Sequence, residues 1–599
     1  MLKILKYLKP YTWSLILLVI LIYVQVQTNL KLPDYMAQII NKGIVVENNS
    51  LIWSTGTKML LVSLLGGACM IVVSYIASRV ASGFSANLRQ RLFTKVESFS
   101  LVEFNKFSTA SLMTRTTNDI TQIQTVLIMV LRMVLMAPIM GIGAIIKAYQ
   151  MAPSMTWIIA LAVGVLTLLI GTLFVIALPK FKILQKMVDK VNLVMREILT
   201  GLRVIRAFNT EKIEENKFDK ANQDLTGLNL FVNRLMVIMQ PMLMLIMNFA
   251  ALLTIWVGAH LINSGSLAIG DMMAFMQYSM QVIMAFLFLT MVFIMVPRAA
   301  VSAERIAEVL DTEVLIKDPE NPTKLPAVGQ GLIEFKDVYF GYPGADIPAL
   351  EGISFKAKPG EITAFVGSTG SGKSTLINLI PRFYDVTNGQ ILVDGVDVRE
   401  IKLESLWSKI GYVPQKGTLF SGTVESNIKY GAPDADENEV KKAAKIAQAT
   451  EFIDTLPEKL ASAISQGGTN VSGGQKQRLS IARALVRKPE IYIFDDSFSA
   501  LDFKTDAALR NALMTETKKK TVLIVAQRIS TVINADHIVV LDEGKVVGQG
   551  RHHDLMKDCP VYSEIALSQL SESELDRSDN SSGKKDVKTP LKLSRKEAL

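Results

Sequence analysis

The sequence predicts a multi-domain protein in which an all-α unit of six transmembrane helices is followed by an α/β domain. The chain has 599 residues, too many for one hydrophobic core. Half of them are apolar although 20% are charged, which fits a membrane-embedded part joined to a soluble one. Long apolar stretches fill the first half, whereas short apolar strands alternate with amphipathic helices in the second.

The six apolar stretches have the length of transmembrane helices, because about 20 helical residues cross the hydrocarbon core. They are approximately residues 12–32, 59–76, 126–146, 155–178, 235–261 and 272–296. Lysines precede the first stretch, as in a signal peptide, but no small-residue cleavage site follows it. We therefore expect it to remain as the first transmembrane helix. The stretches contain no clear acidic residue, which argues against a proton-relay transporter.

Basic residues in the connections predict the orientation. The connections between the second and third and between the fourth and fifth stretches are rich in Lys and Arg, and the others are short or nearly neutral. Both termini and the α/β domain are therefore expected in the cytoplasm, beneath the cytoplasmic membrane. The two basic connections run to about 50 residues and have helical periodicity, which predicts helices that extend out of the membrane. The excess of basic residues behind the net charge of +9 then sets the orientation in the membrane and attracts anionic lipids. No nucleic-acid partner is expected.

Composition also predicts the boundaries of the parts. The membrane unit covers residues 1–300, and a charged, then Pro-rich linker covers 301–330. The α/β domain covers 331–570, and the charged tail at 571–599 is expected to be disordered. Cys69 and Cys559 are too far apart in sequence to indicate a disulfide framework or a metal site. His552 and His553 are expected to be solvated.

The strongest motif is a glycine-rich loop at 367–375, which follows the apolar strand at 362–366 and precedes a helix. This is the Walker A pattern, in which backbone N–H groups surround phosphates at a helix N-terminus. Lys373 is expected to bridge the β- and γ-phosphates of ATP, and the Ser374 hydroxyl to bind Mg²⁺. The residues expected to hold the nucleotide here are Gly367, Ser368, Thr369, Gly370, Ser371, Gly372, Lys373, Ser374 and Thr375. The α/β domain is thus predicted to be a P-loop NTPase.

A second acidic motif supports this prediction. Four apolar residues at 491–494 end in Asp495 and Asp496, about 120 residues after the Walker A loop. Asp495 is expected to reach the Mg²⁺ ion through water.

Further motifs resemble those of the ATP-binding cassette (ABC) family, over nearly the whole chain. The loop formed by Ser472, Gly473, Gly474 and Gln475 resembles the ABC signature sequence. Tyr342 is similar to the aromatic residue that stacks on adenine, and Gln415 to the Q-loop glutamine that contacts the metal. Residues 499–502 resemble the D-loop, and residues 104–119 and 201–209 resemble the coupling helices of ABC exporters. The resemblance implies half of a dimeric exporter, in which each ATP is held by Walker A of one half and the signature loop of the other.

The sequence departs from the family pattern at two catalytic positions. Asp496 stands where the family has a glutamate, and Gln527 where it has a histidine. The aspartate is shorter by one methylene, about 1.5 Å, and a displacement near 1 Å can cost on the order of a hundredfold in rate. Glutamine can donate a hydrogen bond to a γ-phosphate but carries no positive charge. We expect this site to bind ATP and hydrolyse it slowly.

The two departures resemble the non-consensus half of heterodimeric bacterial multidrug exporters. The expected partner is a second half-transporter that carries the glutamate and the histidine. A working homodimer with neutral substitutions is the alternative.

Methionines at 272, 276, 280 and 284 recur every four residues along the last stretch, with others on the fifth. Flexible thioethers suit hydrophobic small molecules, although helix packing or lipid contact is the simpler interpretation of any single one. Arg132, near the cytoplasmic end of the third stretch, could meet an anionic group or extend to the interface. A lipid or peptide exporter and a mainly regulatory ATP-binding subunit remain alternatives.

Overall fold

The computed structural model describes residues 2–326 and 329–569, so the tail expected at 571–599 lies outside the described residues. The chain divides into two compact units. The first comprises Met1–Glu97 and Ser108–Thr312, and the second comprises Ser98–Phe107 and the chain from Glu313 onward.

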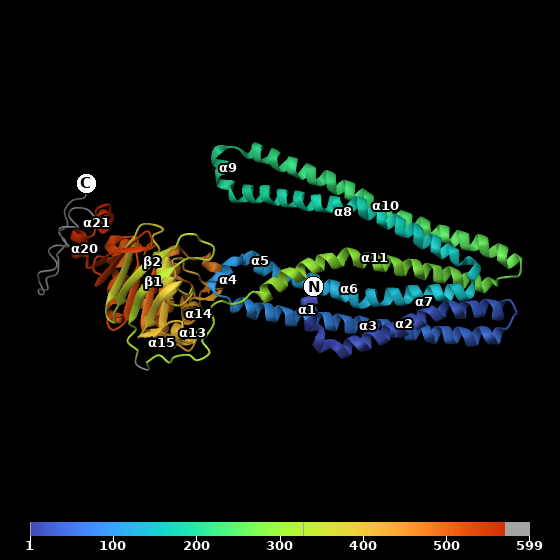
Figure 1. Ribbon diagram of the computed structural model, residues 1–599, viewed down its shortest axis with the longest axis horizontal. Helices are drawn as coiled ribbons and strands as arrows, with labels where there is room; N and C mark the ends of the chain where they lie inside the picture. The colour runs from blue at the N-terminus through green and yellow to red at the C-terminus, as the bar shows by residue number, and fades with distance from the viewer. Residues whose placement is uncertain (1, 327–328, 570–599) are drawn as a thin grey trace. The chain divides into compact units, whose positions relative to one another are not determined.

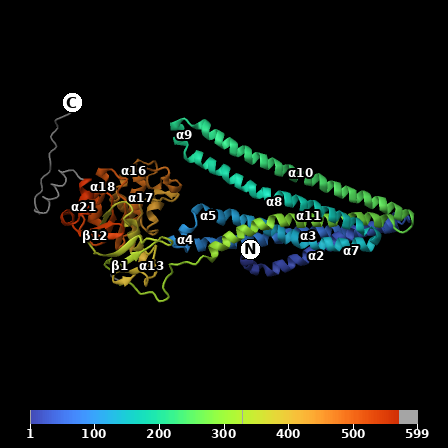
Figure 2. The same cartoon turned by 45° about the horizontal axis from the view of Figure 1, so that its top comes forward.

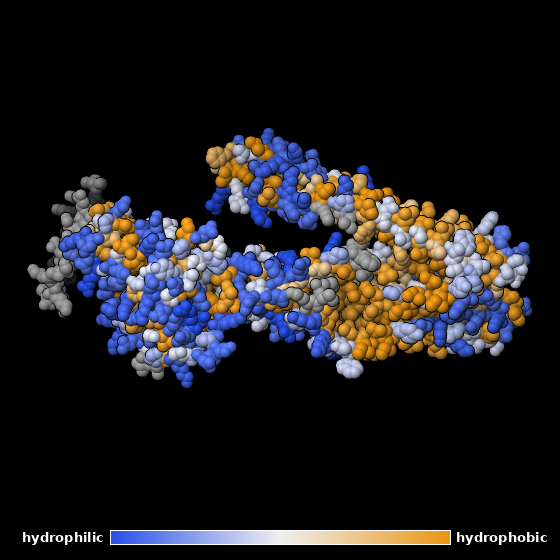
Figure 3. Space-filling model, viewed as in Figure 1, coloured by the Kyte–Doolittle hydropathy of each residue, from blue (hydrophilic) through white to orange (hydrophobic). Residues whose placement is uncertain are grey.

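The first unit is a bundle of long helices, and its described residues contain six that are long and apolar enough to cross a membrane. Its longer helices are α2 (Thr12–Gln38), α3 (Asn49–Glu97), α6 (Ile120–Met129), α7 (Leu135–Met151), α8 (Thr156–Thr200), α10 (Glu211–Asn263) and α11 (Ile269–Asp311). Hydrophobic residues cover the middle of this unit in the space-filling view (Figure 3). The six-helix prediction is confirmed, and most of the helices run well beyond the apolar stretches.

The third membrane helix is longer at its start than its apolar stretch predicts. It begins with α5 (Thr109–Thr114) and contains two π-helical turns, η3 (Arg115–Asp119) and η4 (Val130–Val134), before α7. Arg132 lies in η4, in the middle of this helix. Because residues 109–125 continue the helix ahead of the apolar stretch, Arg132 is not near the end of the helix itself, and its place near the cytoplasmic end of the membrane span stays a prediction.

The helix bundle contains an acidic residue, Asp34, which lies just outside the first predicted apolar stretch. Helix α2 continues to Gln38 and therefore carries Asp34. The Asp34 carboxylate accepts hydrogen bonds from Lys147 Nζ of α7 at 2.7 Å and from the hydroxyl of Tyr278 of α11 at 2.6 Å. Three helices are thus joined by one ion pair and one fully buried tyrosine.

Helix α11 extends into the segment expected to be a linker. Arg305 pairs with Asp119 at 3.3 Å, and Glu308 pairs with Arg115 at 2.8 Å. Ser302 also donates to Asp119 at 2.9 Å. These contacts stabilise helical structure to Asp311, because each charged side chain finds its partner on the neighbouring helix.

Helices α8 and α10 form a long hairpin closed by α9 (Leu202–Phe208), as Figures 1 and 2 show. Its short connecting helix falls in the region predicted to be a coupling helix. Leu202, Val204 and Phe208 of α9 are exposed.

The second unit is an α/β domain built on two larger sheets and a two-stranded ribbon of β7 (Gly422–Thr423) and β8 (Ala463–Ile464). The six-stranded sheet has the order β12-β11-β3-β10-β9-β6, and the four-stranded sheet has the order β2-β1-β4-β5. The strands are β1 (Ile333–Phe340), β2 (Leu350–Ala357), β3 (Ile362–Gly367), β4 (Asn388–Val393), β5 (Val396–Asp397), β6 (Ile410–Val413), β9 (Ile491–Asp495), β10 (Thr521–Val525), β11 (His537–Asp542) and β12 (Lys545–Gly550). Strands β11, β3, β10, β9 and β6 are parallel, as their continuous apolar sequences require for strands buried on both faces. The predicted fold class is confirmed.

Helices cover the large sheet and enclose two hydrophobic cores. They are α12 (Lys373–Leu379), α13 (Leu403–Ser408), α14 (Val424–Lys429), α15 (Glu437–Ile446), α16 (Thr450–Thr455), α17 (Gly473–Val486), α18 (Phe503–Glu516), α19 (Ile529–Val532), α20 (His552–Asp558) and α21 (Pro560–Leu567). His552 of α20 is buried, and its Nδ1 lies 2.7 Å from the hydroxyl of Tyr562 of α21. The expectation that His552 is solvated is wrong, because this polar partner lets the ring pack inside.

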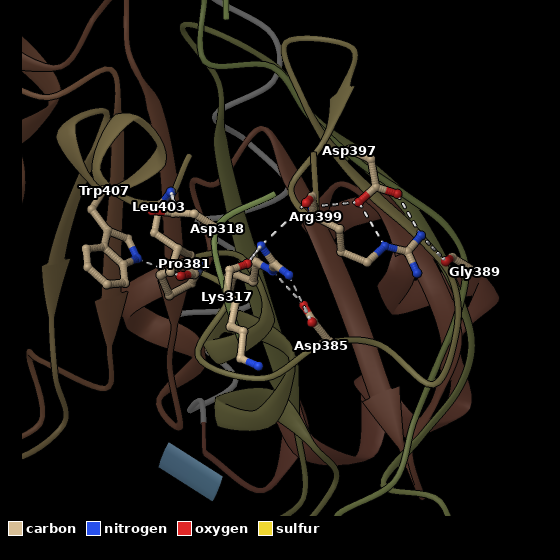
Figure 4. Close-up of polar contacts among 10 residues, drawn as sticks. Lys317, Asp318, Pro381, Asp385, Gly389, Asp397, Arg399, Leu403 and Trp407 are labelled. Atoms are coloured by element: carbon tan, nitrogen blue, oxygen red, sulfur yellow. Dashed lines mark hydrogen bonds and ion pairs between the residues drawn. The ribbon is translucent and has the colours of Figure 1, made fainter. Parts of the chain in front are cut away.

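The start of the second unit is bound to the residues that follow α12 (Figure 4). Arg382 donates to the carbonyl of Lys317 at 3.2 Å and pairs with Asp385 at 2.7 Å. The carboxylate of Asp318 accepts the N–H of Leu403 at 2.7 Å. Residues 317–318 of the expected linker are therefore fixed to the domain.

The segment 98–107 packs on the same region through α4 (Leu101–Lys106). Leu101 and Val102 lie against the core that contains Tyr384, and Asn105 Nδ2 donates to the Tyr384 hydroxyl at 3.4 Å. Glu103 accepts the N–H of Leu315 at 3.0 Å. A short helix from between two membrane helices is thereby part of the α/β unit.

Candidate functional site

Four neighbouring parallel strands deliver the predicted site residues to one edge of the large sheet. In the register of β3, β10 and β9, Phe365 pairs with Val525 and Val525 with Asp495. Gly367 of the Walker A loop, Gln527 and Asp496 follow these residues within two positions, and Gln415 follows the end of β6 in the same way. Ligands of open α/β sheets bind at the carboxyl ends of the strands.

The Walker A loop curls around the ammonium group of Lys373. Its Nζ donates to the carbonyls of Gly367 at 2.9 Å and Ser368 at 2.6 Å, and to Ser371 Oγ at 3.2 Å. Gly372 has a φ of 96°, and a Cβ there would lie 2.7 Å from Leu350, so the turn requires glycine. Burial lowers the pKa of Lys373, and the negative charges of Asp496 and Asp495 oppose this effect. Among the described residues, the Lys373 ammonium group thus has only neutral oxygen atoms as hydrogen-bond partners. A negatively charged phosphate would attract it more strongly than these partners do.

Ser374 and Asp495, two of the three predicted Mg²⁺ ligands, lie beside each other. The Ser374 hydroxyl donates to Asp495 Oδ1 at 3.0 Å. Burial raises the pKa of Asp495, the hydrogen bond from Ser374 lowers it, and the charge of Asp496 raises it. A hydroxyl beside a carboxylate is an oxygen donor set that suits Mg²⁺, which completes its shell with phosphate and water.

Asp496 contacts the Q-loop glutamine. Gln415 Nε2 donates to Asp496 Oδ2 at 3.3 Å. Asp496 is buried and has a φ of 44°, a left-handed conformation that Asp tolerates better than most residues. Burial raises its pKa, while Gln415, Lys373 and Arg528 oppose that shift. The predicted catalytic carboxylate and Gln415 are thus brought together.

One cavity of about 740 Å³ connects these residues. It is lined by Tyr342, Thr369, Gly370, Gly372, Lys373, Ser374, Thr375, Gln415, Asp495, Asp496 and Gln527, among others. The size of the cavity, and the cationic and hydroxyl groups that line it, fit a nucleoside triphosphate with Mg²⁺.

At the aromatic end of the cavity, Tyr342 packs against Tyr384, a residue that the sequence analysis missed. The Tyr342 hydroxyl lies 2.9 Å from Thr375 Oγ1, and its ring meets Tyr384 edge-on at a centroid distance of 5.4 Å. Tyr384 is the same residue that Asn105 of α4 contacts. The turn at Glu543–Lys545 also lines the cavity and was not predicted. No motif marks either element, and only the packing of distant segments identifies them.

The signature loop does not line this cavity. Ser472 instead caps α17: its Oγ accepts the N–H of Gln475 at 3.3 Å, and Gln475 Oε1 accepts the N–H of Ser472 at 2.9 Å. Ser472, Gly473 and Gln475 are partly or fully exposed.

Comparisons with known proteins agree with this arrangement. Residues 15–286 match the family model of the ABC transporter transmembrane region, and residues 350–499 match that of the ABC transporter. An ABC transporter ATP-binding protein of Mycobacterium tuberculosis is 42% identical over 94% of this chain and 97% of its own length. An ATP-dependent lipid A-core flippase of Syntrophus aciditrophicus is 32% identical over 86% of each chain. A solved structure of a bacterial Atm1-family ABC exporter with ATP bound aligns with a TM-score of 0.77 and 25% identity, over 94% of this chain and 99% of that one.

Proposed function

The chain belongs to the ABC transporter family, and from this premise we propose that it is the non-consensus half of a heterodimeric exporter of hydrophobic compounds. It is a multi-pass membrane protein with a cytoplasmic ATP-binding domain, and the membrane and ATP-binding regions are fused in one half-transporter. ABC exporters act as ATPases and work as dimers. The substrate, the partner and the activity of this chain's own site are the parts that we propose.

We assign the roles of the site residues from their contacts. Lys373 and the Walker A backbone bind the phosphates of ATP, and Ser374, Asp495 and Gln415 hold Mg²⁺ with its water. Tyr342 stacks on the adenine, and Ser472–Gln475 meets the γ-phosphate bound to the partner. The domain boundaries at about 300, 330 and 570 are proposed likewise, with the first stretch of the linker helical to Asp311.

The observation that carries the heterodimer proposal is the pairing of Asp496 with Gln415 beside an uncharged Gln527. In this arrangement the short carboxylate is held against the Q-loop side chain, and Gln527 brings no cation to the γ-phosphate. A site of this kind retains ATP more readily than it hydrolyses it. The intact signature loop still serves a partner that carries the glutamate and the histidine.

Exposed apolar residues on α9 support a dimer in which the α8–α10 hairpin reaches the other half. Phe208 is 74% exposed although it lies outside the apolar stretches. Together with Leu202 and Val204 it groups exposed apolar side chains at the tip of the hairpin, which favours an interaction surface there.

The apolar lining of the helical unit supports hydrophobic substrates. A cavity of about 260 Å³ between α8 and α10 is lined only by hydrophobic residues, including Leu161, Leu245 and Phe249. Met280 and Met284 of α11 are partly exposed. An amphipathic lipid is the second candidate substrate, because two lipid A-core flippases, of Syntrophus aciditrophicus and Haemophilus ducreyi, are 32% and 30% identical to this chain. The regulatory alternative would hold if Lys373→Ala left export intact.

The experiment is to purify the chain alone and with a candidate partner half, and to measure ATPase activity in lipid vesicles. The pair is expected to hydrolyse ATP at least tenfold faster than the chain alone. Hydrophobic dyes and phospholipids are then compared as stimulants. Rapid turnover by the chain alone would contradict the heterodimer proposal.

A further inference from the structure

The C-terminal end of the described chain contacts the segment that carries Gln527. Gln569 Nε2 donates to the main-chain carbonyl of Gln527 at 2.9 Å. Its Oε1 accepts the main-chain N–H of Ile529, also at 2.9 Å. One carboxamide therefore spans Arg528 and binds the backbone on both sides of it. Only one amide orientation provides a donor and an acceptor in these places, so the contacts fix the assignment of the oxygen and nitrogen.

The N–H of Ile529 needs such a partner. It opens α19, a helix of four residues whose preceding residue, Arg528, supplies no side-chain cap. The first N–H groups of a helix have no partner within the helix, and a side-chain acceptor stabilises them. Gln569 supplies this acceptor from 40 residues away.

Gln569 is itself fixed by the C-terminal helices. Its own N–H donates to the carbonyl of Ala566 at 3.1 Å, and Ala566 is fully buried. Tyr562, one turn earlier on α21, is fully buried and bonded to His552 of α20. The carboxamide therefore extends from a packed helix pair and not from a loose chain end.

On the other side, the Ala526 N–H donates to the carbonyl of Phe365 at 3.3 Å. The segment between β10 and α19 is thus held at residue 526 by the strand that leads into the Walker A loop, and at residues 527 and 529 by Gln569. Gln527 lies between these anchors, lines the nucleotide cavity and is exposed.

We infer that Gln569 is a positioning residue for the nucleotide site, which sets the reach of the residue-527 side chain by holding its backbone. This inference rests on the proposed function, in which the side chain of residue 527 acts on the γ-phosphate. The hydrogen bonds of Gln569 are to main-chain groups, so they do not depend on which side chain residue 527 carries.

The test uses the full chain in lipid nanodiscs, in a D496E/Q527H background that gives a measurable rate. Gln569→Met removes both hydrogen bonds at similar side-chain length. Gln549→Met is the matched control, because it removes one glutamine hydrogen bond to the Ser354 carbonyl at 2.8 Å elsewhere in the domain. Gln569→Glu keeps an acceptor for Ile529 and loses the donor to residue 527.

Gln569→Met is expected to increase amide hydrogen exchange at residues 527–531 and to lower kcat by about tenfold, since small displacements are costly at reacting groups. The KM for ATP should stay within twofold, and Tm should match that of Gln549→Met. Gln569→Glu should retain protection of Ile529 but not the full rate.

Unchanged exchange at 527–531, or unchanged kcat despite faster exchange, would overturn the inference. So would a fall in Tm or a rise in KM that accounts for the loss of rate. If the D496E/Q527H background is inactive, the proposed function fails at residue 527, whereas the exchange measurement still decides whether Gln569 holds the segment.

Discussion

Gln415 donates a hydrogen bond from its Nε2 to Oδ2 of Asp496 across 3.3 Å, which joins the end of β6 to the end of β9. A longer glutamate at 496 would carry its carboxylate past this contact and farther into the nucleotide cavity. Under the proposed function, the one-methylene difference at this position limits how fast the site hydrolyses ATP.

Substitution of both unusual residues should raise the activity of this chain's own site. We expect D496E/Q527H to increase the ATPase rate of the purified chain by roughly tenfold to a hundredfold, because the carboxylate regains about 1.5 Å of reach and the histidine can carry a charge. Phosphate release measures the rate. Lys373→Ala in the same background should abolish the gain, and a wild-type rate equal to that of the double variant would contradict the prediction.

Nucleotide binding with Mg²⁺ should weaken as the pH falls toward the pKa values of the buried acids. Burial raises the pKa of Asp495 and of Asp496 above 3.8, so each is protonated at a higher pH than an ordinary aspartate. Because Mg²⁺ binds the ionised form, its contribution is complete above the raised pKa and is lost below it. Titration of a fluorescent ATP analogue with Mg²⁺, from neutral pH down toward the ordinary aspartate pKa of 3.8, measures the effect.

Titration in EDTA provides the control, since it reports the pH dependence of nucleotide binding without Mg²⁺. Asp495→Asn should bind more weakly and should lose most of the Mg²⁺-dependent pH profile. If that profile persists in Asp495→Asn, the carboxylate is not the group that titrates.

Tyr342 should contribute to affinity through its ring and only slightly through its hydroxyl. Stacking of a base on an aromatic ring is worth about 1–3 kcal/mol, so Tyr342→Ala should raise the Kd for ATP by roughly fivefold to more than a hundredfold. Tyr342→Phe loses the contact with Thr375 but keeps the ring, and its Kd should stay near the wild-type value. Tyr430→Ala, at an exposed ring outside the cavity, is the control. Equal affinities of the Ala and Phe variants would rule out stacking.

The Asp34–Lys147 pair should stabilise the helical unit. Lys147→Met leaves the Asp34 carboxylate with only the Tyr278 hydroxyl, and a partly buried group that loses its partner costs about 1–3 kcal/mol. Thermal unfolding in detergent should show a lower Tm for Lys147→Met, and Asp34→Asn in addition should recover part of the loss. Lys58→Met, at an exposed lysine of α3, should leave Tm unchanged. A Tm for Lys147→Met equal to that of this control would show that the pair adds no stability.

The local pattern of the sequence was sufficient to predict the parts that depend on neighbours in the chain. Six apolar stretches predicted the helices because a lipid environment imposes length and apolarity on each segment separately. The glycine-rich turn after a buried strand predicted the Walker A loop for the same reason, since the strand, turn and helix are contiguous. The helix ends were less predictable: α11 continues to Asp311 because Arg305 and Glu308 find partners on another helix.

The amino-acid sequence by itself therefore determined the membrane unit, the nucleotide-binding motifs and the two departures at 496 and 527. Only the tertiary structure brought Asp34 to Lys147, Tyr384 to Tyr342, and Gln569 to the backbone at 527–529. These contacts join residues that are 40 to 113 positions apart and follow no periodic pattern. They exist because helices and strands pack along their whole length, and that packing fixes which polar groups meet.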